Sequence, residues 1–247
     1  MQQILPSLLD PPILFAHRGA RAHAPDNTLE SFALALKLGA TGLESDVWFT
    51  ADGEVVCDHD GMVRTRRMKR TPIGGLRRDQ LPAHVPTLAE LVDLCGDRCQ
   101  LSLDLKCPGV GPATIAVVRG VASGLMGRLW LCSPLLSEIE PLRALDADVR
   151  LVDSPRFASL REGPERRAAH LASVGIDGIN MPGVDWTGGL VALFHRFERT
   201  AFSWGLQHEH QLRPALRMGV DAVYSDFVDR MVNAYGSELG GAAPDTA

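Results

Sequence analysis

The chain has 247 residues, of which 45% are hydrophobic and 22% are charged, and its formal net charge at pH 7 is -5. This composition is typical of a globular protein and excludes the disordered and fibrous classes, while the length suits one (β/α)8 barrel, one large sandwich or two small domains. The negative net charge provides no general field for nucleic acid or an anionic membrane, so we expect a small molecule as the partner.

Five cysteines, at positions 57, 95, 99, 107 and 132, are scattered through the chain. Because their number is odd and a chain of this size needs no covalent staples, we expect reduced thiols and a cytoplasmic protein. Packing at a helix end is the favoured interpretation for Cys95 and Cys99, with a bound metal as the alternative. Residues 1–15 lack the pattern of a signal peptide and no stretch approaches the ~20 apolar residues of a membrane span, so no stable membrane insertion is expected.

Short β-rich segments alternate with segments of helical period along almost the whole chain, which predicts βαβ units around a parallel sheet. Strands are predicted at Ile13–His17, Gly42–Trp48, Gln100–Leu105, Leu129–Cys132, Val149–Val152, Gly178–Asn180, Ala201–Trp204 and Ala222–Ser225. Helices are predicted at Thr28–Leu38, Thr87–Leu94, Pro112–Ala122, Glu165–Ser173, Leu190–Phe197 and Gln211–Met218. Eight strands in such alternation predict an α/β fold, a single TIM barrel.

We expect this barrel domain to span residues 1–240, followed by a flexible tail at residues 241–247. The Gly- and Ala-rich composition that suggests disorder begins at Gly236. The start of the first helix is predicted from Asn27 and Glu30, which fit a capping box.

One interruption of the alternation follows the second strand. A tight turn at residues 51–53, Ala-Asp-Gly, leads into a short β-like run at residues 54–58. The basic, turn-rich segment Gly61–Val85 comes next, and we expect it to form a loop or small insertion over one end of the barrel. Its basic run, Arg64–Arg70, is interpreted as solvated loop.

Polar side chains inside buried strands are informative, because an unpaired buried charge is too costly to keep. Residues two apart on a strand share a face, so Glu44 and Asp46 are expected to point the same way. On the third strand, Ser102, Asp104 and Lys106 are expected to face the barrel axis, while the leucines that alternate with them face the helices. Three carboxylates and one cation should therefore meet at one place.

Two histidines are expected at the same mouth of the barrel. His17 and Arg18 end the first strand, at the rim where barrel active sites are built, and His59 follows the short run after the second strand. Three carboxylates without His or Cys beside them favour one hard divalent cation, Mg²⁺ or Ca²⁺, over zinc. Two imidazoles, Arg18 and Lys106 beside such an ion suit phosphoryl chemistry. In that chemistry positioning and charge neutralisation do most of the work, and proton transfer is left to imidazole.

Several short motifs occur in the order and spacing of one enzyme family. They are His17-Arg18-Gly19, Pro25-Asp26-Asn27-Thr28, Glu44-Ser45-Asp46-Val47, Thr50-Ala51-Asp52-Gly53, His59-Asp60 and Pro86-Thr87-Leu88, followed by Trp204, Gly219-Val220-Asp221 and Ser225-Asp226. Through these motifs the chain resembles the glycerophosphodiester phosphodiesterase family over essentially its whole length.

The resemblance implies a TIM barrel that hydrolyses a small-molecule glycerophosphodiester to glycerol 3-phosphate and an alcohol. It also implies these roles: binding of the divalent cation by Glu44, Asp46 and Asp104, general acid and base catalysis by His17 and His59, and substrate contacts from Arg18, Lys106 and Trp204. The alternative for Arg18 and Lys106 is that they are counter-ions of the acids.

The chain departs from the family's usual pattern at three places. The acid of the third strand, usually glutamate, is Asp104, and the usual glutamate before Asn-Thr is Asp26. The usual Trp-Thr-Val-Asn is Trp-Gly-Leu-Gln at residues 204–207. A side chain one methylene shorter at Asp104 predicts that the ion lies closer to the third strand or is bridged by water.

Two other functions stay open. A phospholipase D-like enzyme acting on lysophospholipids would need an apolar rim around the barrel mouth, and the arginine-rich segment Gly61–Val85 does not supply one. A non-catalytic protein that binds glycerophosphodiesters would have no need of an acid–base pair, so the retention of His17 and His59 argues against it.

Overall fold

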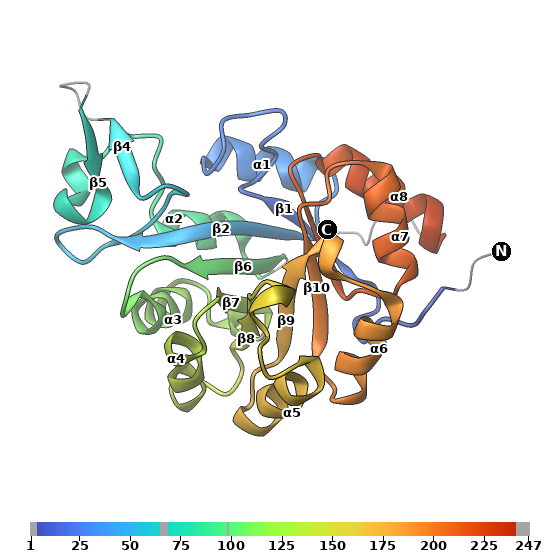
Figure 1. Ribbon diagram of the computed structural model, residues 1–247. Helices are drawn as coiled ribbons and strands as arrows, with labels where there is room; N and C mark the ends of the chain where they lie inside the picture. Colours follow the sequence, from blue (N-terminus) through green and yellow to red (C-terminus); the bar gives the residue numbers. More distant parts are fainter. Residues whose placement is uncertain (1–3, 65–68, 98, 241–247) are drawn as a thin grey trace.

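Eight short runs of apolar residues form parallel strands that close into a barrel in the computed structural model, which describes residues 4–64, 69–97 and 99–240 (Figure 1). Each strand is buried on both faces, as expected where helices cover the outside of a parallel sheet. In barrel order the strands are β1 (Ile13–His17), β2 (Gly42–Phe49), β6 (Gln100–Leu105), β7 (Leu129–Ser133), β8 (Arg150–Asp153), β9 (Gly178–Pro182), β10 (Thr200–Trp204) and β11 (Ala222–Ser225). Pairing of β1 with both β2 and β11 closes the ring, and the predicted TIM barrel is confirmed.

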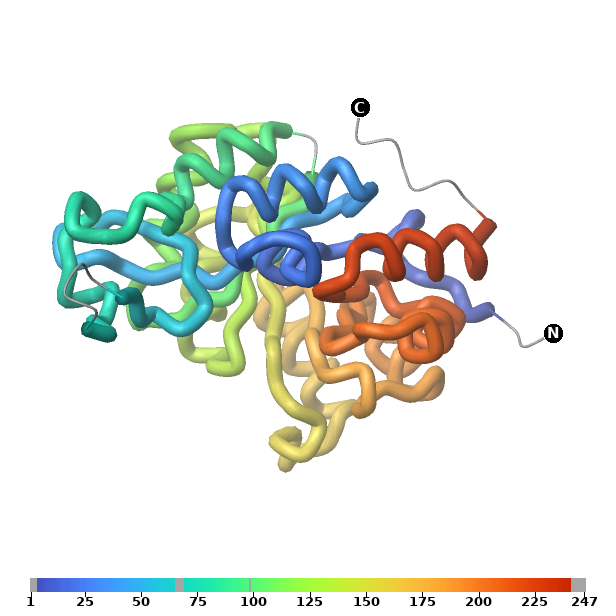
Figure 2. The backbone as a smooth tube through the Cα atoms, turned by 90° about the horizontal axis from the view of Figure 1, so that it is seen from above, coloured from blue at the N-terminus to red at the C-terminus, as the bar shows by residue number. Residues whose placement is uncertain are grey.

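Helices connect the strands and cover the outside of the barrel (Figures 1 and 2). They are α1 (Leu29–Lys37), α2 (Leu88–Cys95), α3 (Val110–Val121), α4 (Leu136–Ile139), α5 (Pro164–Val174), α6 (Gly188–Arg196), α7 (Glu209–Arg217) and α8 (Val228–Leu239). The prediction of disorder from Gly236 onward was wrong for the residues up to Leu239, because they complete α8, which buries Met231 and Tyr235 against the core. Residues 241–247, the expected flexible tail, lie outside the described residues.

Helix α1 begins one residue later than its sequence signal predicted. Thr28 is the N-cap, and its hydroxyl oxygen accepts from the backbone N–H of Ser31 at 3.2 Å. Asn27 is instead in the left-handed region, with φ 52°, and its side-chain oxygen accepts from the Ser45 hydroxyl at 2.7 Å. The capping box was wrong because the Asn27 side chain is used to fasten this loop to β2, between Glu44 and Asp46.

The excursion after β2 is a folded unit with apolar residues of its own. Strand β3 (Val55–Cys57) runs antiparallel to β2, and β4 (Met62–Arg64) pairs with β5 (Arg70–Pro72) in a separate ribbon. Behind them lies a small cluster of buried side chains, Val56, Val63, Ile73, Leu81 and Val85. In both views this unit lies at the end of the molecule away from α7 and α8 (Figures 1 and 2). Residues 65–68 of the basic run lie outside the described residues.

Aromatic side chains fill the interior of the barrel toward the amino ends of its strands. Phe15, Trp130, Phe202 and Tyr224 face inward, and the rings of Phe15 and Tyr224 stack with their centroids 4.7 Å apart. The outward-facing residues of the same strands join the larger core beneath the helices. Because this aromatic layer fills the barrel on the side of the amino ends of the strands, inward side chains at the carboxyl ends are left to form a pocket.

Two of the five cysteines are joined, contrary to the expectation of reduced thiols. Cys95, at the end of α2, and Cys99, just before β6, form a disulfide with their Cα atoms 5.8 Å apart. Counting scattered cysteines could not reveal that the turn between them brings both within bonding range. Cys57, Cys107 and Cys132 are free. The cytoplasmic location stays a prediction, and one of its premises holds for three cysteines only.

Among the described residues, no helix has both the length and the apolarity that a membrane crossing requires.

Asp153 predicts a pH dependence of stability. It ends β8, is fully buried, and its two carboxylate oxygens make no hydrogen bond within the described chain, while Arg167 lies 3.4 Å away. Burial raises its pKa from 3.8 to about 7. The folded state therefore holds a proton that the unfolded state releases, so stability falls as pH rises through this window. Between pH 5 and pH 8 the loss should be roughly 2–3 kcal/mol.

We expect Asp153→Asn to lack this loss. The free energy of unfolding of the variant should therefore increase relative to that of the parent as pH rises. Urea unfolding of both proteins at pH 5 and pH 8 measures the difference. Parallel pH dependence of the two proteins would contradict the assignment to Asp153.

Candidate active site

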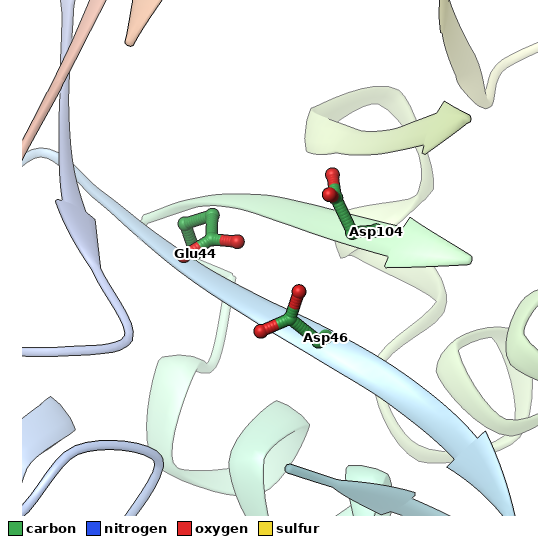
Figure 3. Close-up of side chains that lie close together, drawn as sticks. All are labelled: Glu44, Asp46 and Asp104. Carbon is green, nitrogen blue, oxygen red and sulfur yellow. The ribbon is translucent and has the colours of Figure 1, made fainter. Parts of the chain in front are cut away.

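Three carboxylates meet at the carboxyl ends of β2 and β6. Alternation along β2 turns Glu44 and Asp46 to the inside of the barrel, and the register pairs Asp46 with Asp104 on β6. Figure 3 shows the three side chains on the same side of the two neighbouring strands. One ligand atom from each lies within 4.8 Å of the others, which is the spacing of a metal-binding group.

Burial and mutual repulsion disfavour the charged forms of these carboxylates. Burial, with the charges of Asp46 and Asp104 adding to it, raises the pKa of Glu44 to about 8, against the opposing effect of His17. Burial likewise raises the pKa of Asp104. Asp46 Oδ2 is buried without a hydrogen-bond partner among the residues that the structure describes. Clustered acids with an unsatisfied oxygen fit a hard divalent cation, which would supply the missing charge and ligand contacts.

Lys106 is the nearest cation to this group. Its Nζ lies 2.9 Å from Asp46 Oδ1 and 2.9 Å from Asp104 Oδ2. Burial acts to lower the pKa of Lys106, but the two carboxylates outweigh it and the pKa is raised. The side chain is therefore a charged counter-ion of the acids in this structure.

His17 lies beside the acids and is held by a fourth carboxylate. Its Nδ1 is 2.6 Å from Asp226 Oδ1, and its Nε2 is 3.8 Å from Glu44 Oε2. Burial acts to lower the pKa of His17, but Glu44 and Asp226 outweigh it and the pKa is raised. With Nδ1 bound to Asp226, Nε2 is the nitrogen left to face the acids and a substrate.

No role was predicted for Asp226, although Ser225-Asp226 was recognised as a motif. It follows β11 directly, and its backbone N–H donates to the side-chain oxygen of Gln207 at 2.9 Å. Gln207 is one of the residues at which the chain departs from the family pattern, so this departure still serves to position Asp226. A polar residue just after a barrel strand was the available signal, because rim positions of this kind carry catalytic groups.

His59 lies at the outer lip of the site. It follows β3, its side chain is 41% exposed, and its Nδ1 is 2.8 Å from Asp60 Oδ1. Asp60 in turn pairs with Arg70 of the excursion at 3.1 Å. The folded excursion thus positions the second histidine, which is far more open to solvent than the first.

Arg18 occupies a strained position at the end of β1. Its φ is 56°, in the left-handed region that non-glycine residues seldom adopt, and its backbone N–H donates to Glu44 Oε2 at 2.9 Å. Its side chain lies 3.8 Å from Asp46 and 3.6 Å from Asp26. Nε of Arg18 is buried without a hydrogen-bond partner in the described part of the chain, so the guanidinium group is available to an anion.

All eight predicted site residues line one cavity of about 380 Å³ at the carboxyl ends of the strands. The lining consists of His17, Arg18, Glu44, Asp46, His59, Asp104, Lys106, Pro134, Ser154, Asn180, Trp204, Gly205, Gln207 and Tyr224. A larger cavity of about 590 Å³ lies at the opposite end of the barrel, around Ile13, Thr41 and Gln100. The predicted catalytic groups line the smaller one, at the end where barrel enzymes carry their active sites.

Residues 17–103 match the model of the glycerophosphoryl diester phosphodiesterase family. The chain is also 27% identical to a glycerophosphodiester phosphodiesterase of Bacillus altitudinis over 255 residues, covering 89% of this chain and 96% of the relative. Both likenesses are to the glycerophosphodiester phosphodiesterase family. The family match ends at residue 103, so it contains both histidines and the two acids of β2 but stops just before Asp104.

Solved structures of the family share the fold. A phosphodiesterase of Oleispira antarctica, crystallised in complex with the product sn-glycerol-3-phosphate, superimposes with a TM-score of 0.77 at 22% identity, covering 90% of this chain and 96% of that one. The glycerophosphodiester phosphodiesterase of Thermotoga maritima gives a TM-score of 0.78 at 21% identity, covering 90% and 97%.

The contact between His17 and Asp226 leads to a prediction. Asp226→Asn keeps the side-chain volume but removes the negative charge that orients the His17 imidazole and favours its protonated form. We therefore expect kcat to fall roughly 10- to 100-fold while KM changes little. A double variant with His17→Ala should be no worse than His17→Ala alone, because Asp226 acts through His17. Additive losses in this cycle, measured by steady-state kinetics, would show that Asp226 acts independently.

Proposed function

We propose that this chain hydrolyses glycerophosphodiesters to glycerol 3-phosphate and an alcohol, using one divalent cation, Mg²⁺ or Ca²⁺. The observation that carries the proposal is the convergence of Glu44, Asp46 and Asp104 with His17 and His59 on one cavity. The match to the family supports the reaction class, and the sn-glycerol-3-phosphate in the Oleispira structure supports the product.

In this proposal Glu44, Asp46 and Asp104 would hold the cation, which would supply positive charge to neutralise and polarise the phosphate. Arg18 and Lys106 hold the remaining phosphate oxygens, Lys106 by leaving one of its two carboxylates. A glycerol hydroxyl attacks phosphorus, one histidine takes its proton, and the other protonates the oxygen of the departing alcohol. Water then opens the cyclic glycerophosphate with the two histidines in reversed roles.

The proposal is tested by measuring turnover of a panel of glycerophosphodiesters after chelation and after separate return of Mg²⁺ and Ca²⁺. We expect chelation to remove activity and one of the two ions to restore it. Full activity after chelation would exclude the metal, and binding without any turnover would favour the non-catalytic alternative.

A second candidate, a phospholipase D-like enzyme acting on lysophospholipids, is favoured by one observation. The loops that follow β7, β8 and β9 carry Leu135, Phe157 and Val184, whose exposures are 58%, 42% and 89%. The apolar rim that the sequence did not supply in residues 61–85 is therefore offered by the other side of the mouth. Adding lysophospholipids to the same panel decides between the two, because only the second candidate cleaves them faster than deacylated substrates.

Asp104 provides a prediction about ion affinity. A longer arm should reach the ion directly, so we expect Asp104→Glu to bind the ion as tightly as the parent or more tightly. Asp104→Asn should bind it less well, and Asp104→Ala worst of all. Calorimetric titration of the metal-depleted proteins with Mg²⁺ or Ca²⁺ measures this order of affinities. If Asp104→Ala bound the ion as well as the parent, Asp104 would be a partner for Lys106 only.

A further inference from the structure

The cavity has two chemically different halves. Seven of its lining residues are ionisable at or near neutral pH or carry charge, and they come from β1, β2, β6 and the loop after β3. The remaining lining residues, Pro134, Ser154, Asn180, Trp204, Gly205, Gln207 and Tyr224, form a wall of uncharged side chains at normal pH. In the proposed mechanism the first half serves the phosphate and the ion, whereas the second half takes no part in it except through Gln207, which positions Asp226.

Asn180 is the most telling residue of the uncharged half. It lies on β9 in register with Phe202, whose side chain fills the barrel, while its neighbours Ile179 and Met181 join the outer core. Asn180 is only 7% exposed, and its side-chain oxygen has no hydrogen-bond partner within the described residues. A buried amide without a partner is costly to the fold, so a partner supplied by the ligand is the simplest account.

Ser154 adds a second polar group to this wall. Its hydroxyl oxygen is buried and makes no regular hydrogen bond to the described chain, with only the weak Cys132 thiol facing it. A hydroxyl and a carboxamide together can donate to and accept from an alcohol group. The pair is therefore suited to a ligand that brings hydroxyls rather than charge.

Trp204 argues against a cationic ligand in this half. The guanidinium group of Arg156 lies 5.4 Å from the centre of its ring, so the ring already has a cation as neighbour. A quaternary ammonium group would have to approach the same ring against that positive charge, without a carboxylate of the uncharged wall to offset it.

We propose that Asn180, assisted by Ser154, binds a hydroxyl of the departing alcohol, which gives the enzyme a preference for uncharged polyhydroxy leaving groups such as glycerol or inositol over choline. This inference rests on the proposed function. In-line displacement sets the leaving oxygen opposite the attacking hydroxyl. Both the attacking hydroxyl and the leaving oxygen need a histidine, and both histidines lie in the charged half, so the rest of the departing alcohol is left to extend toward the uncharged wall on the side of β8 and β9.

The test compares kcat/KM for glycerophosphoglycerol and glycerophosphocholine in the parent and in Asn180→Ala, with inhibition by glycerol 3-phosphate as a third measurement. The parent should favour glycerophosphoglycerol. Loss of one hydrogen bond should lower kcat/KM for this substrate roughly 5- to 10-fold, with little change for glycerophosphocholine or for inhibition by the product. Ser203→Ala is the matched control, because its buried hydroxyl also lacks a partner in the described chain but is absent from the cavity lining.

A nearly isosteric variant guards against a simple folding defect. Asn180→Asp introduces negative charge, so the ratio of rates should shift toward glycerophosphocholine, a gain that misfolding cannot produce. Equal losses on both substrates, weakened product inhibition or an unchanged ratio in both Asn180 variants would overturn the subsite alone. A parent that cleaved neither substrate would overturn the proposed function with it.

Discussion

Replacing Glu44 by glutamine or Asp46 by asparagine should remove both the binding of the divalent ion and the activity that depends on it. Both side chains are almost fully buried, and they provide two of the three carboxylates whose oxygens lie within 4.8 Å of one another. Outer-shell partners of metal ligands already cost about 10- to 100-fold when replaced, so loss of a ligand itself should exceed ~10²-fold in kcat/KM. The amides keep the volume, so the barrel should stay folded.

Calorimetric titration with Mg²⁺ and Ca²⁺, followed by steady-state kinetics, measures both effects. Asp93→Asn is the matched control, because Asp93 is an exposed acid on α2, away from the cavity lining. Undiminished ion binding in both Glu44→Gln and Asp46→Asn would contradict the assignment of the metal site.

His17→Ala and His59→Ala should each lower turnover by at least ~10²-fold while the fold stays intact, which is the contribution of one positioned acid or base. The two histidines line the same cavity in different surroundings. His17 is held by Asp226, whereas His59 lies near the solvent beside Asp60. Proton removal and proton delivery each need one of them, so neither loss should be compensated by the other.

Turnover and thermal unfolding of the two variants are compared with His170→Ala. His170 forms a similar pair with Glu140, at 2.9 Å, but lies outside the cavity. A histidine whose removal left turnover and its pH profile unchanged would have no part in the chemistry.

The barrel was predictable because its signals are local. Each strand is a short apolar run whose side chains alternate between its two faces, so the placing of Glu44 with Asp46, and of Asp104 with Lys106, on inward faces follows from spacing alone. Closure of a parallel barrel then brings neighbouring strands together at one end, and the structure does unite all eight predicted site residues in one cavity.

What the sequence did not reveal depends on contacts between distant residues. The bond between His17 and Asp226 joins positions 209 residues apart, and no local pattern encodes it. Asn27 was misinterpreted because the hydroxyl of Ser45, on another element, competes for its side chain. The end of α8 was misjudged because burial of its apolar face outweighs an unfavourable local composition.

The contact of Lys106 with both Asp46 and Asp104 has a bearing on the order in which the enzyme is assembled. The mutual repulsion of three clustered acids disfavours their convergence when no cation is near them. Here the ammonium group of Lys106 is part of the chain itself, so it can screen the acids as soon as β2 and β6 pair. Under the proposed function the barrel can thus finish folding before the ion binds, and the supply of the ion would then set how much of the folded protein is active.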